Sequence, residues 1–248
     1  MILLVDIGNS NIYFGLAEKD KILKTFRLTS SQTKSADEYY LLLQGFLKEY
    51  IVENAIICSV VPVVTSALKK CFEKYLNIKP LIMGQGLKTG IKIKADDPKG
   101  VGSDLIADSV AGLSLYDECL IIDLGTATKF IYVKNNALEG VVIAPGVAVS
   151  TKAMIQHAAL LPNIELVAPK KVLNNSTIPC MQSGVVYGFA SMIDGMIIRI
   201  KDELKIENLK IVSTGGLAKL IIPSCKEEIV LDDDLILKGL LQIYNKNI

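Results

Sequence analysis

Tryptophan is absent from this sequence of 248 residues, and histidine occurs once. Histidine is the usual side-chain base near neutral pH and a frequent metal ligand, so its scarcity argues against a histidine-based catalytic or metal site. Cysteine is also sparse: the five cysteines are scattered and odd in number, with no pair at CxxC spacing. We therefore expect reduced thiols in a cytoplasm rather than disulfides or a zinc site.

Charge of one sign and long hydrophobic runs are missing as well. The 27 basic and 26 acidic residues leave a net charge of +1, which gives nucleic acid no electrostatic footprint. Uninterrupted apolar runs fall well short of the roughly 18 residues that a membrane span needs. The stretch MILLV runs into Asp6 without a basic region or a cleavage site, which indicates a first strand rather than a signal peptide. We expect a cytoplasmic protein with no nucleic-acid partner and no membrane association.

Apolar residues are abundant, at half of the sequence, and they follow strand and helix patterns in an order that occurs twice. Each half opens with three predicted strands, at 1–5, 12–18 and 21–28 and then between 119 and 146, and has a later buried strand, at 54–61 and at 209–218. Helical periodicity is found at 39–50, 65–76, 104–115, 151–161, 180–204 and 234–247. The sequence predicts an α/β protein of two similar units, 1–115 and 116–248.

Two short stretches share one pattern, VDIGNS at 5–10 and IDLGTAT at 122–128. In each, an apolar run ends in aspartate, and one apolar residue then precedes glycine and small polar residues. Such a turn offers consecutive backbone N–H groups to phosphate oxygens, and glycine lets the ligand approach the backbone. A carboxylate at this strand end, Asp6, could hold Mg²⁺ through water. One copy alone would indicate an ordinary hairpin, whereas two copies predict a nucleotide cleft between two units.

A third stretch, STGGLA at 213–218, follows the late strand of the second half. Its double glycine would let a flat ring such as adenine approach the backbone. The three stretches resemble the nucleotide-binding motifs of the actin, sugar-kinase and acetate-kinase superfamily. Within it, the whole chain resembles the type III pantothenate kinases, through the further motifs SADEY, SVVP, GVGSD, APG, MQSGVVYG and DDDLILKGL.

The resemblance implies a fold of two ribonuclease-H-like (actin-like ATPase) units with a nucleotide cleft between them. It implies the phosphorylation of pantothenate to 4'-phosphopantothenate by ATP with Mg²⁺, the first step of coenzyme A biosynthesis. It also implies a monovalent cation, K⁺ or NH₄⁺, and a homodimer. The helical stretch at 180–204 carries Gly184, Gly188 and Gly195, which allow close helix packing, either in that dimer or within one chain.

Site residues follow from the resemblance position by position. Asp104 matches the general base that takes the proton from the pantothenate hydroxyl, a role that suits a carboxylate; a helix N-cap is the alternative reading, and both can hold. Asp123 would face the monovalent cation. The ATP phosphates would be contacted by Asp6, Ile7, Gly8, Asn9, Ser10, Asn11, Ile12, Tyr13 and Thr126, and the substrate by Gly102, Ser103, Asp104, Leu105 and Thr177.

Several positions depart from the family pattern. Leu105 stands where an arginine would pair with the pantothenate carboxylate, Ala95 replaces a tyrosine, and Asp108 replaces an asparagine. These changes leave open a nucleotide-binding pseudokinase or regulator, and a kinase of another small hydroxyl compound. Lys129 stands where a threonine is common and is either a replacement charge or a solvated lysine. His157 is expected in a core or an interface.

Overall fold

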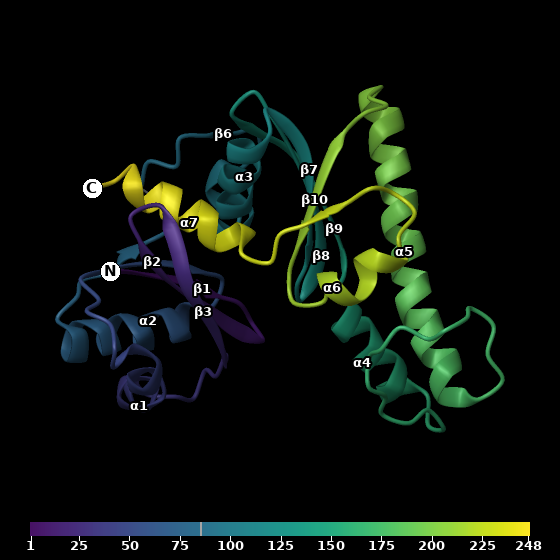
Figure 1. The fold of residues 1–248 in the computed structure, drawn as a ribbon, viewed down its shortest axis with the longest axis horizontal. Coiled ribbons are helices and arrows are strands. Elements are labelled where there is room, and N and C mark those ends of the chain that lie inside the picture. The colour runs from purple at the N-terminus through teal and green to yellow at the C-terminus, as the bar shows by residue number, and fades with distance from the viewer. Residues whose placement is uncertain (85) are drawn as a thin grey trace. The chain divides into compact units, whose positions relative to one another are not determined.

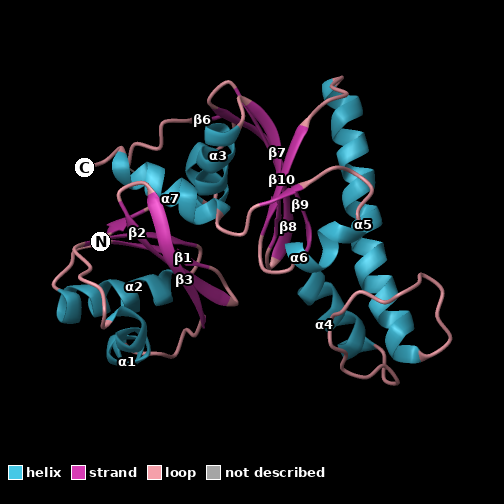
Figure 2. Cartoon of the chain, in the orientation of Figure 1, coloured by secondary structure: helices cyan, strands magenta, loops and turns pink. Residues whose placement is uncertain are grey.

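The structure is a computed structural model that describes residues 1–84 and 86–248. The chain forms two mixed sheets flanked by helices, so the predicted α/β fold is confirmed (Figure 1, Figure 2). It divides into two compact units. The first contains Met1–Leu115, Asn136–Leu138 and Asp234–Ile248, and the second contains Tyr116–Asn135 and Glu139–Asp233.

The first unit is built on a five-stranded sheet in the order β3-β2-β1-β4-β5. The central strand β1 pairs antiparallel with β2 and parallel with β4. β1 is buried on both faces, which explains why its sequence reads as a continuous apolar run. The strands are β1 (Ile2–Ile7), β2 (Asn11–Glu18), β3 (Lys21–Thr29), β4 (Asn54–Ser59) and β5 (Leu81–Ile82).

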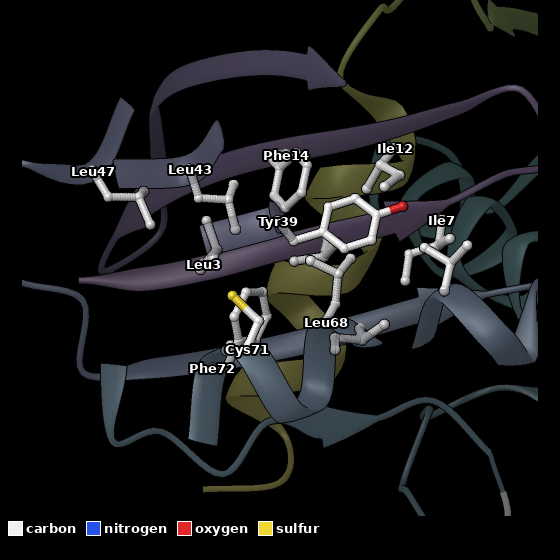
Figure 3. Packing of buried hydrophobic residues seen from close by; sticks show 14 of the residues in the cluster. Leu3, Ile7, Ile12, Phe14, Tyr39, Leu43, Leu47, Leu68, Cys71 and Phe72 are labelled. Atoms are coloured by element: carbon white, nitrogen blue, oxygen red, sulfur yellow. The ribbon is translucent and has the colours of Figure 1, made fainter. Parts of the chain in front are cut away.

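Helices cover both faces of this sheet. On one face, Leu3 and Phe14 pack with Tyr39, Leu43 and Leu68 of α1 (Ala36–Leu47) and α2 (Pro62–Cys71) (Figure 3). Helix α1 begins with a capping box, since Ser35 Oγ accepts from Glu38 N at 3.3 Å. A π-helical turn, η1 (Phe72–Leu76), continues α2, and a 3₁₀ turn, η2 (Pro98–Gly100), precedes α3 (Ser103–Leu115).

The second unit repeats this topology. Its sheet has the order β11-β10-β7-β8-β9-β6, and the central strand β7 pairs antiparallel with β8 and parallel with β10. Strands β7 to β11 are numbered here by their order in the chain, as are β1 to β5. Both sets then lie in the same spatial order, third, second, first, fourth and fifth, as expected for two similar units; β6 is added beside β9. The strands of this sheet are β7 (Glu118–Leu124), β8 (Ala127–Lys134), β9 (Ala137–Pro145), β10 (Lys210–Thr214) and β11 (Val230–Leu231), together with β6 (Lys92–Ile93), whose residues belong to the first unit.

One face of the second sheet packs against helices. Leu120 and Ile122 of β7 share a core with Val186 and Ile193 of the 28-residue helix α5. Within the described residues, α5 is long and apolar enough to cross a membrane by length and composition, which the count of uninterrupted apolar runs did not anticipate. Its buried face lies on the sheet, as in a core helix. The helical elements are α4 (Val147–His157), α5 (Thr177–Leu204), α6 (Ala218–Ile221) and η3 (Ile222–Ser224).

The C-terminal helix α7 (Leu235–Asn245) belongs to the first unit, whereas the sequence placed it with residues 116–248. The reason is its apolar face, because Leu237 and Leu240 pack with Leu4 and Ile56 on the sheet face opposite α1 and α2. Chain order alone could not show which sheet this face would cover.

Helices α3 and α7 touch at Gly239. A Cβ atom there would overlap the carbonyl oxygen of Ala107. We expect Gly239→Ala to lower the free energy of unfolding by about 1–3 kcal/mol, because the helices would have to separate. Gly45→Ala in α1 is the control, since a Cβ there meets nothing within 4 Å and helix propensity favours alanine by about 0.5–1 kcal/mol. Urea unfolding compares the two; equal effects would show that α3 and α7 are not closely packed.

Candidate functional site

The turn between β1 and β2 is the first candidate phosphate site. Gly8 N donates to Asn11 O at 2.9 Å, and Ser30 N donates to Ser10 O at 3.0 Å, so the turn is fixed from both sides. The intervening residues Asn9, Ser10 and Asn11 are exposed. The turn therefore presents short polar side chains and backbone to a ligand while its ends are held by the sheet.

Three of the predicted ATP contacts have buried side chains. Ile7 and Ile12 pack in the core under α1 and α2. Tyr13 faces the other side, where its hydroxyl donates to Asp234 Oδ1 and the Arg27 guanidinium lies 3.6 Å from its ring centroid. Burial, followed by the hydrogen bond to Asp234, raises the pKa of the Tyr13 hydroxyl. These side chains fix the turn onto the unit, so any ligand contact from Ile7 and Ile12 would come from their backbone.

The turn between β7 and β8 repeats the device in the second unit. Gly125 N donates to Ala127 O at 3.1 Å, and Thr126 is exposed. Gly146, which precedes α4, is so close that a Cβ atom there would overlap the Thr126 carbonyl. Thr128 Oγ1 donates to Pro145 O at 3.2 Å. The APG stretch at 144–146 thus packs directly against this turn.

Asp6 and Asp123 occupy equivalent positions, each the penultimate residue of the central strand of its sheet. Directly opposite on the antiparallel neighbour stand Tyr13 and Lys129. Lys129 Nζ donates to Asp123 Oδ2 at 2.6 Å. The solvated-lysine reading is therefore wrong, because the ammonium is paired with a carboxylate and only 14% of the side chain is exposed.

The STGG turn passes beside the same carboxylate. Gly215 has φ of +99°, and a Cβ atom there would lie 2.6 Å from Asp123 Oδ1 and 2.7 Å from Leu124 N. A side chain at this position would therefore be excluded both by its conformation and by its neighbours. Within the second unit, the structure brings the predicted adenine turn next to Asp123.

Ser103 joins the start of α3 to the end of β4. Its Oγ donates to Ser59 O at 3.0 Å and accepts from Ser59 N at 3.2 Å, and Cys58 Sγ lies 3.2 Å away as a further donor. Cys58 is the residue opposite Asp6 in the parallel pairing of β1 and β4. The hydroxyl of Ser103 therefore ties the predicted substrate stretch 102–105 to the strand beside the phosphate turn.

Asp104, the candidate base, lies in the first turn of α3, which begins at Ser103. The N-cap reading is therefore wrong. Asp104 Oδ1 accepts from Leu105 N at 2.9 Å, and a Cβ atom at Gly102 would overlap this oxygen. Glycine at 102 thus leaves the space that the Asp104 carboxylate occupies, half-buried at the edge of the unit.

Three carboxylates act on one buried thiol. Burial, followed by the negative charge of Asp6, raises the pKa of the Cys58 thiol well above its usual range, and Asp104 and Asp108 add to the effect. The first unit thus gathers acidic side chains at the end of β1 and in the first two turns of α3. Within the described residues, no group of three or more histidine, cysteine, aspartate or glutamate side chains could hold a metal ion. Magnesium bound through ATP needs only one or two carboxylates, so Asp6 fits that ion.

The remaining predicted residues lie elsewhere. Leu105 is 8% exposed, so its side chain faces the interior of the first unit. Ala95 is exposed in the loop after β6, and Thr177 is exposed at the start of α5 in the second unit. His157 is exposed at the end of α4, so it is not a core histidine.

Sequence reasoning missed three supporting residues, Cys58, Ser59 and Asp234. Asp234 is the N-cap of α7, and it also accepts a hydrogen bond from the Tyr13 hydroxyl. A serine that ends a continuous apolar strand, as Ser59 does, was an available signal. No sequence pattern predicts the hydrogen bond between Asp234 and Tyr13, which lies 221 positions earlier.

Solved structures define the class of this fold. A protein of Sinorhizobium meliloti, provisionally described as a 2-dehydro-3-deoxygalactonokinase, has a TM-score of 0.59 at 12% identity, over 99% of this chain and 98% of that one. A Baf family protein of Campylobacter jejuni, provisionally described as a transcriptional activator, has a TM-score of 0.58 at 22% identity, over 99% and 98%. At these identities the likeness concerns the fold, which is that of the actin-like sugar kinases.

Sequence comparison then gives the family. A family model described as type III pantothenate kinase matches residues 2–199. A type III pantothenate kinase of Acholeplasma laidlawii (strain PG-8A) is 49% identical over 248 residues, covering all of both chains. The chain belongs to the type III pantothenate kinase family.

The Ser103 link can be tested by stability alone. We expect Ser103→Ala to lower the free energy of unfolding by about 1–3 kcal/mol, because the Ser59 N–H loses its acceptor. Ser114→Ala is the matched control on the same helix; this exposed hydroxyl donates to Ala111 O at 2.7 Å, and its loss should change stability by less than about 0.5 kcal/mol. Urea unfolding of both variants gives the comparison, and a neutral Ser103→Ala would contradict the link.

Proposed function

We propose that this protein transfers the γ-phosphoryl group of ATP to the hydroxyl of pantothenate, giving 4'-phosphopantothenate and ADP in the first step of coenzyme A biosynthesis. The observation that carries the proposal is the 49% identity to a type III pantothenate kinase over the whole length of both chains. The two glycine turns offer backbone N–H groups for phosphates, and Asp6 of β1 and Asp104 of α3 offer carboxylates for a cation and a proton, which suits a kinase. We propose a cytoplasmic location for it, with no nucleic-acid or membrane partner.

ATP and a divalent cation are the cofactors of such a reaction. In our proposal, the phosphates are contacted by Thr126 and by the turn from Asp6 to Tyr13. Asp6 holds Mg²⁺, which would neutralise charge on the phosphate oxygens. The resemblance also assigns a monovalent cation, K⁺ or NH₄⁺, to Asp123, but the Lys129 ammonium already lies on this carboxylate.

The proposed chemical step is carried by Asp104. Its carboxylate takes the proton of the acceptor hydroxyl as the hydroxyl oxygen forms a bond to the γ-phosphorus and the bond from phosphorus to the ADP oxygen breaks. Gly102 leaves room for the carboxylate, and Ser103 holds the start of α3 in place. We assign Gly102, Ser103, Leu105 and Thr177 to the acceptor side.

A different hydroxyl acceptor is the second candidate. Leu105 offers no hydrogen bond to a carboxylate, and its side chain is buried, so it would not replace the expected arginine. Ala95 likewise lacks a polar side chain. An acceptor without the pantothenate carboxylate would not need these contacts.

An assay of ATP consumption with and without pantothenate, with the product identified by mass, tests the proposal. We expect a phosphorylated product from the parent protein and a rate about 10²- to 10⁴-fold lower from Asp104→Asn, because the amide cannot accept the proton. ATP binding by calorimetry should change by less than about threefold, since the phosphate turns are intact. The exposed Asp117→Asn is the matched control. A variant Asp104→Asn that keeps more than about half of the parent rate would overturn the assignment of the base.

We further propose a homodimer that uses α5. A Cβ atom at Gly184, Gly188 or Gly195 would meet nothing within 4 Å, so this side of the helix is open within the chain. Exposed apolar residues, Ile178 and Ile198, lie on the same helix. An open glycine row flanked by apolar side chains suits close approach of a second helix.

Light scattering in low salt is expected to return twice the chain mass of 27.0 kDa. Gly188→Arg should yield monomers, because the long cation would keep a second helix away, whereas Gly45→Arg on the exposed side of α1 should stay dimeric. A parent protein with the mass of one chain would contradict the dimer, and a dimeric Gly188→Arg would contradict the use of α5.

A further inference from the structure

The pair of Lys129 and Asp123 is unusually enclosed for a lysine and a carboxylate near the surface. Both side chains are 14% exposed, and the two charged atoms are 2.6 Å apart. The same two strands carry a second cross-strand pair at their other end, Lys134 and Glu118, at 3.2 Å with exposures of 40% and 29%. Water therefore screens the Lys134 pair more effectively than the Lys129 pair.

Backbone from two turns closes around the Asp123 carboxylate. A Cβ atom at Gly125 would lie 3.4 Å from both carboxylate oxygens, and one at Gly215 would lie 2.6 Å from Oδ1. The glycines thus bring the DLGT and STGG turns against this side chain. The Lys129 ammonium reaches Oδ2 within this enclosure, from directly across the strand pair.

A fixed ammonium and a bound monovalent cation would compete for this carboxylate. A lysine ammonium carries one positive charge and three N–H donors. It is chemically an NH₄⁺ ion in which one hydrogen is replaced by the bond to the side chain. Two unit positive charges about 4 Å apart near a protein surface repel strongly enough to weaken binding of the second by roughly a thousandfold. The residues at Asp123 therefore do not fit an additional monovalent cation.

We propose that the Lys129 ammonium permanently supplies the positive charge beside Asp123 that the family resemblance assigns to K⁺ or NH₄⁺. Turnover then needs neither ion. The inference rests on the proposed kinase function, and Lys129 acts in it as a positioning residue for Asp123 and the turns that enclose it.

The experiment measures rates in the chlorides of K⁺, NH₄⁺, Na⁺ and choline at equal ionic strength. The parent should turn over at rates within about twofold in all four. Lys129→Thr, which introduces the residue common in the family, should lose at least tenfold in Na⁺ and choline and recover most of this in K⁺ or NH₄⁺. Lys129→Arg, which keeps the charge, should resemble the parent, and Lys134→Thr is the control for loss of a cross-strand lysine.

A second readout does not depend on activity. Thermal unfolding without substrates should show that K⁺, compared with choline, raises the melting temperature of Lys129→Thr, because an ion that binds the folded state stabilises it. The melting temperatures of the parent and of Lys134→Thr should not respond. If Lys129→Thr does not fold, Lys129→Gln, which keeps most of the side-chain length without the charge, takes its place in both measurements.

Two results would overturn the inference. One is a parent protein whose rate in K⁺ exceeds that in Na⁺ and choline by more than about fivefold. The other is a folded Lys129→Thr that loses activity without rescue by K⁺ or NH₄⁺, which is the result of a purely structural ion pair. Absence of phosphorylated product from the parent in every salt would instead refute the kinase proposal, and the melting temperatures would then decide on the cation alone.

Discussion

Each unit depends on a central strand that is hydrogen-bonded on both sides, largely buried, and has an aspartate as its penultimate residue. The strand ladder fixes the backbone of Asp6 and of Asp123, so neither carboxylate can withdraw from the end of its sheet. Glycine two residues later then turns the chain with its N–H already bonded, to Asn11 O and to Ala127 O. The aspartate carboxylate and the exposed glycine turn are thereby held in fixed positions relative to each other, and the other elements of each unit keep them there.

The supports differ between the units, and the difference has chemical meaning. In the first unit, the residue opposite the aspartate is Tyr13, which reaches Asp234, while Ser103 joins α3 to β4. The acidic side chains there lie near the Cys58 thiol, and their negative charges add to the effect of burial in raising its pKa. In the second unit, the opposite residue is Lys129, which neutralises its aspartate. One topology thus places carboxylates beside a buried thiol in one copy and a lysine–aspartate pair in the other.

Much of this could be predicted from the sequence, since local patterns carried it. The apolar runs before Asp6 and Asp123 predicted buried central strands, and the repeated D-x-G turns predicted like units. The capping box at Ser35 fixed the start of α1. Contacts between distant segments were not predictable in this way: α7 covers the first sheet, Tyr13 reaches Asp234, and Leu105 faces inward. Periodicity tells which face of a helix is apolar, but not which of two sheets that face will cover.

The placement of α7 has a consequence for synthesis. Leu4 and Ile56 belong to a core that Leu237 and Leu240 complete, and the whole second unit lies between these segments in the chain. On the ribosome, the first unit emerges with this sheet face covered only in part, by Ala107 and Val110 of α3, until the final helix is made, whereas the second unit has all its residues earlier. The usual N-to-C order of folding is therefore reversed for the last step, and a chain interrupted before residue 235 would expose an apolar sheet face to chaperones and to its neighbours.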